Sequence, residues 1–247
     1  MQQNDEDDLR RTALSFGAVA ETYDQGRPGY PTEALAWVLP TDAARVVDLG
    51  AGTGKATRVL ATLVPEVIAV EPDPAMRAQL LRVLPDVPVL MGEGASIPMA
   101  DASVDAVVVA QAWHWMDPIV ASLEVARVLR PGGTLGLVWN LRDESVPWAA
   151  RLSALMDQPG ERAMGAEAPQ VGPPFTTPEH HEVRWVHEQS RSDFLAMISS
   201  RSYISTLPAD ERQALLGRVE ALLDSEPALR GDVVPVPYVT HSHRTKR

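Results

Sequence analysis

The stretch that decides the fold is Val46-Val47-Asp48-Leu49-Gly50-Ala51-Gly52-Thr53-Gly54. Its apolar start is typical of a buried strand, and glycines at three alternate positions are typical of a tight turn. Residues 56–64 follow, with apolar side chains spaced for one face of a helix. In such a strand-turn-helix unit the backbone can come close to a ligand, beside the amide groups of the helix N-terminus. The stretch therefore predicts a ligand-binding turn.

Three classes of ligand use turns of this kind, and two of them fit poorly. A triphosphate loop reads G-x-x-x-x-G-K-[ST], but Gly50 to Gly54 is one residue too short and Ala56 replaces the hydroxyl residue. A dinucleotide turn reads G-x-G-x-x-G, whereas the third glycine comes one position early here. Asp48 would repel a pyrophosphate, but it suits a ligand that carries an ammonium or sulfonium charge. These residues favour S-adenosylmethionine.

The motif V-V-D-L-G-A-G-T-G resembles the first motif of class I S-adenosylmethionine-dependent methyltransferases of the methyltransferase type 11 family, and four further motifs follow in order. The resemblance covers roughly residues 15–140 by motif and the rest by layout. It implies an α/β fold, a Rossmann-like seven-stranded sheet that is mostly parallel, with an antiparallel last strand and helices on both faces. It also implies methyl transfer with S-adenosylmethionine as the cofactor.

The glycine turn and one carboxylate carry the strongest cofactor prediction. Asp48, Gly50, Gly52 and Gly54 belong to the turn itself. Glu71 ends the next predicted strand, 21 residues beyond Gly50, where an acidic side chain meets a ribose. A carboxylate can accept hydrogen bonds from both neighbouring ribose hydroxyls.

The resemblance implies further cofactor contacts from three other segments. Y-D-x-x-R-P-x-Y-P precedes the core and would reach the methionine end, although packing and a surface ion pair are alternative roles for its tyrosine and arginine. G-E-G-A-S-I-P stands where the family has G-D-A-x-x-L-P, whose acid accepts from the adenine amino group, so glutamate lengthens that arm. The loop after the strand at 103–109 would hold the cofactor edge. The residues concerned are Tyr23, Arg27, Glu93, Gly94, Ala110 and Gln111.

Trp113-His114-Trp115 lies in that same loop, where the acceptor should meet the cofactor. His114 is the candidate general base, with contact to a ligand or support of the loop as alternatives. Trp113 and Trp115 are predicted to stack on the acceptor or to seal the pocket. The W-H-W segment resembles small-molecule methyltransferases, including the trans-aconitate-methyltransferase-like group, and not the N-P-P-Y segment of many N-methyltransferases. The resemblance implies a small-molecule acceptor, methylated at oxygen or carbon.

Periodicity and turn residues give the remaining expectations. Arg130-Pro131-Gly132-Gly133 is predicted to form a turn, and Asp73 is predicted to cap a helix. Strands are expected at 67–70, 88–91, 103–109, 134–139, 182–188 and 233–240, and further helices at 31–38, 56–64, 119–129, 193–200 and 208–223.

Composition narrows the class of protein. The 247 residues fit one domain, 15–247, after an acidic arm, 1–14, that is expected to lack fixed structure. Residues 157–181 are rich in proline and glycine and are predicted to form a lid or insertion loop. A net charge of -11 disfavours nucleic acid as a partner. The absence of cysteine and of a long apolar run fits a cytoplasmic monomer or homodimer without a membrane span.

The remaining histidines predict no metal site. His180 and His181 are neighbours, and His241 and His243 would share one strand face, but no third ligand is evident in the sequence. Two other functions stay open from the residues alone. One is a methyltransferase-like protein that binds the cofactor without catalysis. The other is a nucleotide-dependent oxidoreductase, which Asp48 and the early third glycine disfavour.

Overall fold

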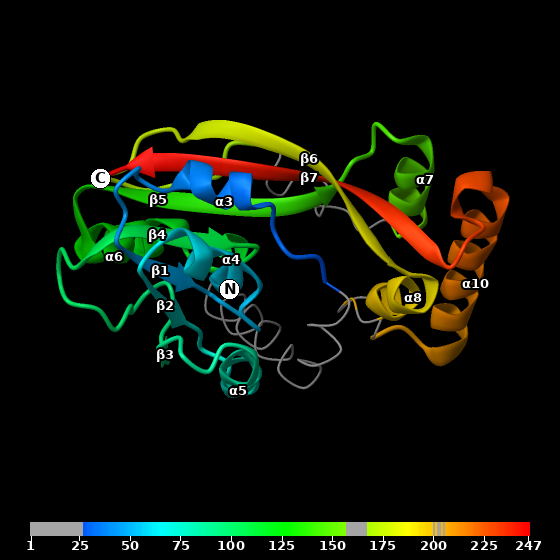
Figure 1. Cartoon of the computed structure of the whole chain (residues 1–247), viewed down its shortest axis with the longest axis horizontal. Coiled ribbons are helices and arrows are strands. Elements are labelled where there is room, and N and C mark those ends of the chain that lie inside the picture. The colour runs from blue at the N-terminus through cyan, green and yellow to red at the C-terminus, as the bar shows by residue number, and fades with distance from the viewer. Residues whose placement is uncertain (1–26, 157–166, 200, 202–203, 205) are drawn as a thin grey trace, which may run out of the picture.

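A seven-stranded sheet with the order β3-β2-β1-β4-β5-β7-β6 forms the centre of the computed structural model (Figure 1). The structure describes residues 27–156, 167–199, 201, 204 and 206–247, so Tyr23 and the predicted arm lie outside the described residues. The strands are β1 Arg45–Leu49, β2 Glu66–Val70, β3 Val89–Leu90, β4 Val104–Ala110, β5 Leu129–Arg142, β6 Glu179–Ser190 and β7 Val233–Lys246.

The strand directions confirm the predicted fold class. β1 pairs in parallel with β2 and β4, and the parallel pairing continues to β3 on one side and β5 on the other. β7 is antiparallel to both of its neighbours, β5 and β6. The order of connection reverses between β1 and β4, and ligands of open α/β sheets bind beyond the carboxyl ends of the strands at such a switch point.

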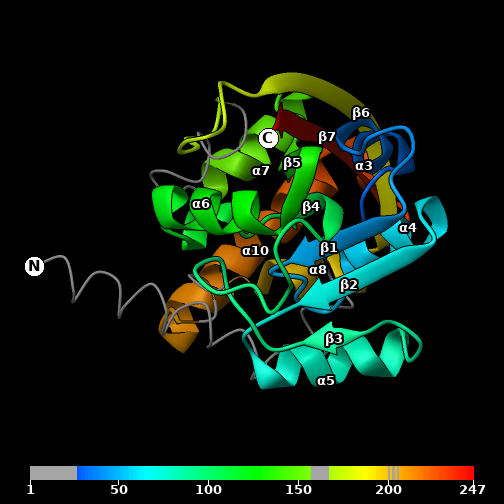
Figure 2. The ribbon, with the colours of Figure 1, turned by 90° about the vertical axis from the view of Figure 1, so that its left-hand side faces the viewer.

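Helices cover both faces of this sheet, on opposite sides in Figure 2. Leu35 and Leu60 lie in one core cluster, with strand residues such as Val46 and Val108. Val125 lies in the core of the other face. The helices are α3 Thr32–Val38, α4 Lys55–Leu63 and α5 Pro74–Val83 on the first face and α6 Pro118–Val128 on the second.

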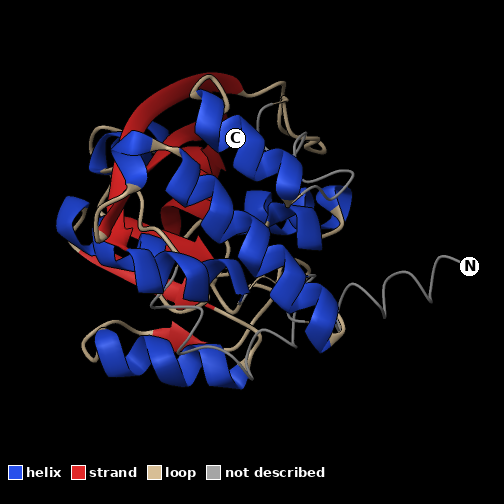
Figure 3. Cartoon of the chain, turned by 90° about the vertical axis from the view of Figure 1, so that its right-hand side faces the viewer, coloured by secondary structure: helices blue, strands red, loops and turns tan. Residues whose placement is uncertain are grey.

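A second core lies where the β6–β7 pair extends past β5. Residues 238–246 of β7 pair with β5, whereas residues 233–237 pair with β6 and not with β5. Val234 and Val236 are fully buried there, against helices that form a layer in front of the strands in Figure 3. These helices are α7 Pro147–Leu155, α8 Arg191–Ser199 and α10 Ala209–Ser225, with the short η3 Pro227–Leu229. No helix in the described part of the chain is long and apolar enough to cross a membrane.

Local signals account for where α5 begins. The Asp73 side chain accepts hydrogen bonds from the backbone N–H groups of Ala75 and Met76, at 2.8 and 3.0 Å. Pro74 occupies the first turn, where its missing N–H costs nothing. The predicted cap at Asp73 is confirmed.

Three strand boundaries differ from the sequence predictions. Arg130-Pro131-Gly132-Gly133 was expected to be a turn, but β5 already starts at Leu129, and its register with β4 shifts between the pairs at Val104 and Ala106. β6 starts at Glu179, so 179–181 are strand residues and not part of a loop. β7 also continues six residues past 240, because polar side chains there find partners in neighbouring elements.

Candidate functional site

The glycine turn after β1 lies at the carboxyl edge of the sheet. Gly50, Gly52 and Gly54 have φ angles of +71°, +56° and +89°, which favour glycine. A Cβ on Gly50 would lie 2.6 Å from Cβ of Ala112, and one on Gly54 would lie 2.9 Å from Cγ of Leu80. A Cβ on Gly52 would meet no atom of the described residues within 4 Å. Gly50 and Gly54 therefore serve close packing, and Gly52 faces space that a ligand can occupy.

Asp48 is a buried residue of β1 that comes two positions before the first glycine of this turn. Its side chain is fully buried, and Oδ2 accepts a hydrogen bond of 2.5 Å from the hydroxyl of Thr57 in α4. Burial raises the pKa of the Asp48 carboxyl to about 7. The sequence suggested a carboxylate that attracts a positively charged ligand. The structure shows Asp48 joining β1 to the first turn of α4, with a charge that is only partly present at neutral pH, and its contribution to ligand binding stays a prediction.

We expect the Asp48→Asn variant to gain stability relative to the wild type as pH rises. Because the folded-state pKa of Asp48 lies above its unfolded value, the wild type loses stability from about pH 4 to about pH 7, and a neutral side chain does not. Between pH 5 and pH 8 the difference in unfolding free energy between the two proteins should shift by roughly 2–3 kcal/mol in favour of the variant. Urea unfolding at both pH values measures this shift, and a constant difference would contradict the raised pKa.

Glu71 lies beside the glycine turn, at the end of β2. Its side chain is 7% exposed, and its two carboxylate oxygens accept from the backbone N–H groups of Gly52 and Asp73, at 2.8 and 2.9 Å. Burial raises the pKa of this carboxyl. Each carboxylate oxygen can accept a second hydrogen bond, so these backbone contacts leave capacity for two hydroxyl groups. Glu71 therefore connects the turn to the start of α5 and can still bind a ligand.

The loop that carries Glu93 and Gly94 folds back on itself. The backbone groups of Glu93 and Ser96 exchange hydrogen bonds of 3.1 and 2.9 Å. Gly94 is buried, and a Cβ there would lie 2.6 Å from Sδ of Met116, in the loop after β4. Gly94 and Gly50 thus both pack against the loop after β4, which brings three predicted cofactor segments together.

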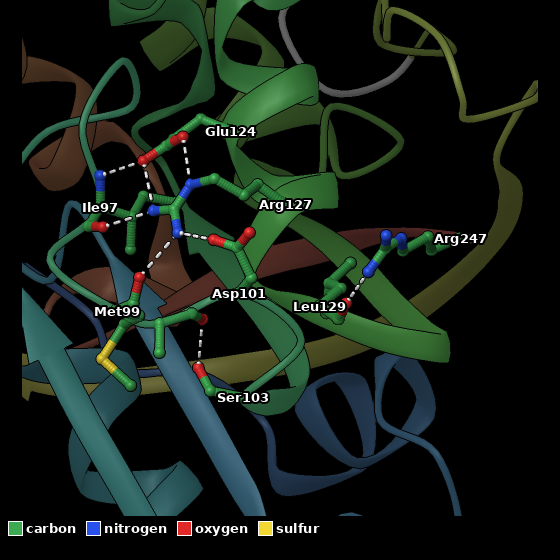
Figure 4. A network of polar contacts seen from close by, with 9 residues as sticks. Ile97, Met99, Asp101, Ser103, Glu124, Arg127, Leu129 and Arg247 are labelled. Carbon is green, nitrogen blue, oxygen red and sulfur yellow. Dashed lines mark hydrogen bonds and ion pairs between the residues drawn. The ribbon is translucent and has the colours of Figure 1, made fainter.

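An ion-pair network on α6 fixes this loop (Figure 4). Arg127 donates to the backbone carbonyls of Ile97 and Met99, at 2.9 and 2.8 Å. Its guanidinium also donates to both carboxylate oxygens of Glu124, one of which accepts from the Ile97 N–H at 2.8 Å. This pairing lowers the pKa of the Glu124 carboxyl. The network holds the segment after Glu93 against α6 without using side chains of the site.

Gln111 opens the loop after β4 in a strained conformation. Its φ angle is +59°, which is uncommon for a residue other than glycine and which persists only where the surroundings enforce it. Its backbone N–H donates to the Val138 carbonyl at 2.8 Å, and its side-chain amide donates to the Asn140 carbonyl at 3.0 Å. Asn140 in turn donates to the Gly29 carbonyl at 2.8 Å. This chain of contacts brings the segment of Arg27 to the loop that follows Ala110.

The W-H-W segment forms a short 3-10 helix, η2 Trp113–Trp115. Trp113 is 4% exposed, lies in the core of the α6 face, and donates from its indole N–H to the Gln170 carbonyl at 2.9 Å. His114 and Trp115 are half-buried, with ring centroids 4.7 Å apart. The two tryptophans were predicted to stack on the acceptor or to seal the pocket. The core position of Trp113 suits sealing, and the half-buried Trp115 is the better candidate for contact with the acceptor.

Sequence reasoning missed three residues that shape the site: Thr57, Asn140 and Arg127. Asn140 had a usable signal, since a polar residue near the carboxyl end of an apolar strand often faces a ligand edge. Arg127 follows Glu124 by three positions, a spacing that pairs charges on one helix face. Thr57 had no local signal, because only the packing of α4 on β1 brings its hydroxyl to Asp48.

Known proteins resemble this chain over most of its length. The family model described as a methyltransferase domain matches residues 47–137. An uncharacterized methyltransferase of Mycobacterium bovis is 46% identical over 232 residues, which cover 94% of this chain and 95% of the relative. One from Schizosaccharomyces pombe is 31% identical over 222 residues, covering 86% and 88%. A solved structure assigned as a type II methyltransferase from Anaeromyxobacter dehalogenans has a TM-score of 0.61 and 26% identity, covering 89% of this chain and 97% of that chain.

Proposed function

Because the chain belongs to the class I S-adenosylmethionine-dependent methyltransferases, we propose that it methylates a small molecule at oxygen or carbon. One observation supports the cofactor site above the others. Glu71, a buried carboxylate with spare acceptor capacity, accepts from the N–H of Gly52, whose α-carbon faces space that no described atom fills. A ligand fits this junction if it presents two neighbouring hydroxyls to Glu71 and lies close to the protein backbone at Gly52.

The proposed roles of the chain's own residues follow from this junction. Glu71 accepts from both ribose hydroxyls, while Glu93 and Gly94 border the adenine and Gln111 borders the same edge. Arg27, linked to the loop after β4 through Gly29 and Asn140, reaches the methionine end. The bound cofactor supplies a methyl group that its sulfonium charge already activates. The protein's task is then to align acceptor and methyl group and to exclude water. Such alignment can lower the activation barrier by about 7–11 kcal/mol.

The acceptor side of the site lies at η2. His114 takes the proton of a hydroxyl acceptor, and Trp115, at a ring distance of 4.7 Å from His114, stacks on the acceptor. The predicted lid, 157–181, falls partly outside the described residues, at 157–166. Its described part touches η2 through Gln170, and this contact supports a role at the acceptor site. The proposed setting is the cytoplasm, with the chain as a monomer or homodimer.

We expect Glu71→Ala to weaken cofactor binding by the ~1.5–3 kcal/mol typical of a hydrogen bond to a charged group. Part of the change will come from the turn, because the Gly52 N–H loses its acceptor, and the free protein will also lose stability. A cofactor analogue without the two ribose hydroxyls separates these effects in a double-mutant cycle. Calorimetry should show that Glu71→Ala loses binding free energy for the cofactor and loses far less for the analogue. An equal penalty for both ligands would mean that Glu71 only shapes the turn.

Comparative calorimetry tests the cofactor assignment itself. S-adenosylmethionine and S-adenosylhomocysteine should both bind with one site per chain, and NAD should give no heat. Binding of NAD without binding of S-adenosylhomocysteine would overturn the proposal in favour of a nucleotide-dependent oxidoreductase.

A further inference from the structure

Imidazole and carboxylate side chains gather on one face of the β6–β7 pair, apart from the cofactor residues. The register places Glu182 opposite His241 and His180 opposite His243. Directly paired residues share a face of the sheet, as do residues two positions apart on a strand, so all four side chains point the same way. We call His180, Glu182 and His241 the histidine–glutamate cluster.

The spacing within this cluster matches the ligand spacing of a small metal ion. Nε2 of His180 lies 3.1 Å from Nδ1 of His241, which lies 3.6 Å from Oε1 of Glu182. All three ligand atoms are within 4.8 Å of one another. A tetrahedral ion with bonds of ~2.0–2.2 Å keeps its ligand atoms about 3.3–3.6 Å apart. Small rotations of the exposed His180 and Glu182 side chains are therefore enough for three-fold coordination.

The rings of His180 and His241 meet at their edges. Their planes differ by only 5°, and the facing nitrogens are within hydrogen-bonding distance of each other. One of these two nitrogens must carry a proton to make that bond, and the other accepts it. A divalent ion bound between the rings takes the place of this shared proton.

Neighbouring side chains hold two of the three ligands. The His180 ring stacks on that of His243, with centroids 4.6 Å apart, and His243 is only 1% exposed. Glu182 has its Oε2 paired with Arg184 at 3.2 Å, which leaves Oε1 directed toward His241. His241 is only 8% exposed, and its Nδ1 faces both the His180 ring and the Glu182 carboxylate. The ligand set is thus partly arranged before any ion binds.

We propose that the histidine–glutamate cluster is a binding site for a divalent transition metal ion, with Zn²⁺ as the expected ion and water as the remaining ligand. Two imidazoles and one carboxylate suit Zn²⁺, Cu²⁺ or Ni²⁺ and not Mg²⁺ or Ca²⁺, which prefer oxygen ligands. The Arg184 guanidinium, 3.2 Å from Oε2 of Glu182, places a positive charge near the site and opposes the binding of a cation there. The affinity for the ion must therefore come mainly from the two imidazoles. A bound ion would join the edge strand β6 to β7.

Calorimetric titration of the full chain, without an affinity tag, with ZnCl₂ tests this proposal. We expect one saturable site per chain in the wild type, and no heat with MgCl₂. His180→Gln and Glu182→Gln should each weaken Zn²⁺ binding by at least about tenfold. Loss of a residue that only hydrogen-bonds to a metal ligand already has an effect of this size. Both positions are exposed, so these substitutions leave the core intact.

His181→Gln is the matched control, because His181 lies on the same strand but on the opposite face. Its ring stacks on Trp37 at 5.2 Å and lies 3.6 Å from Glu33 in α3. This variant should bind Zn²⁺ like the wild type, and Zn²⁺ should raise the melting temperature of both. The absence of saturable binding at one ion per chain would overturn the proposal. So would a loss in His181→Gln equal to that in His180→Gln.

Discussion

The Gly52→Val variant is expected to lose S-adenosylmethionine binding, with a Kd above about 1 mM, which corresponds to less than ~4 kcal/mol of binding free energy. A Cβ at this position meets no described atom within 4 Å, so a valine side chain would occupy the space into which the cofactor comes. The same substitution also strains the backbone, because Gly52 has a φ of +56°. Calorimetry with S-adenosylhomocysteine measures the loss of affinity, and circular dichroism reports whether the fold is kept.

Gly132→Val is the control that separates two effects of Gly52→Val, the filling of the cofactor space and the strain of the backbone. Gly132 has a φ of +82° and also meets no described atom within 4 Å, but it lies at the start of β5, at the opposite edge of the sheet. Both variants should lose a similar amount of stability, about 1–2 kcal/mol or more for a left-handed residue with a side chain. Only Gly52→Val should lose the cofactor. If both variants bind it equally, Gly52 does not border the site.

His114→Ala is expected to lower kcat by at least about 100-fold for an oxygen acceptor, which is roughly 2.7 kcal/mol of transition-state stabilisation. The imidazole lies in η2, at the carboxyl end of β4, and is proposed to take the acceptor's proton. The Kd of S-adenosylmethionine should change little, since the proposed cofactor contacts are made by other residues. A carbon acceptor that its own substituents activate would show a smaller loss.

His114→Gln sharpens this test, because glutamine keeps a hydrogen-bonding group but cannot act as a base. The variant should be nearly as slow as His114→Ala, and its pH–rate profile should lose the limb that belongs to the imidazole. A Gln variant with wild-type kcat would assign His114 to positioning of the loop or the acceptor, and would exclude the base role.

The sequence predicted the elements around the cofactor turn because their signals are local. The glycines after β1, the acid after β2 and the Asp73 cap each depend on residues within a few positions, and the structure has them where expected. The seven-stranded order could be predicted only through the family resemblance, since no local pattern states which strands are neighbours.

What the sequence did not predict depends on contacts between distant residues. The end of β7 is polar in sequence, yet Ser242 is fully buried there. The protein tolerates this burial because the Ser242 hydroxyl donates to the Ala34 carbonyl at 3.1 Å, a contact between residues 208 positions apart. The sequence could not show that Glu182 lies beside the histidines, because only the register of β6 on β7 places it opposite His241, in the cluster that we propose as a metal site. The indole contact of Trp113 with the Gln170 carbonyl is also invisible in the sequence, so the sequence could not separate acceptor contact from sealing of the pocket for this residue.

Methyl transfer from isotopically labelled S-adenosylmethionine into a metabolite extract tests the central claim most directly. The wild-type chain should transfer label to the small-molecule fraction and produce S-adenosylhomocysteine in equal amount, and Gly52→Val should do neither. Label that appears only in protein or nucleic acid would contradict a small-molecule acceptor. Saturable cofactor binding without transfer of label to any small molecule would contradict the proposed reaction and would favour a protein that binds the cofactor without catalysis.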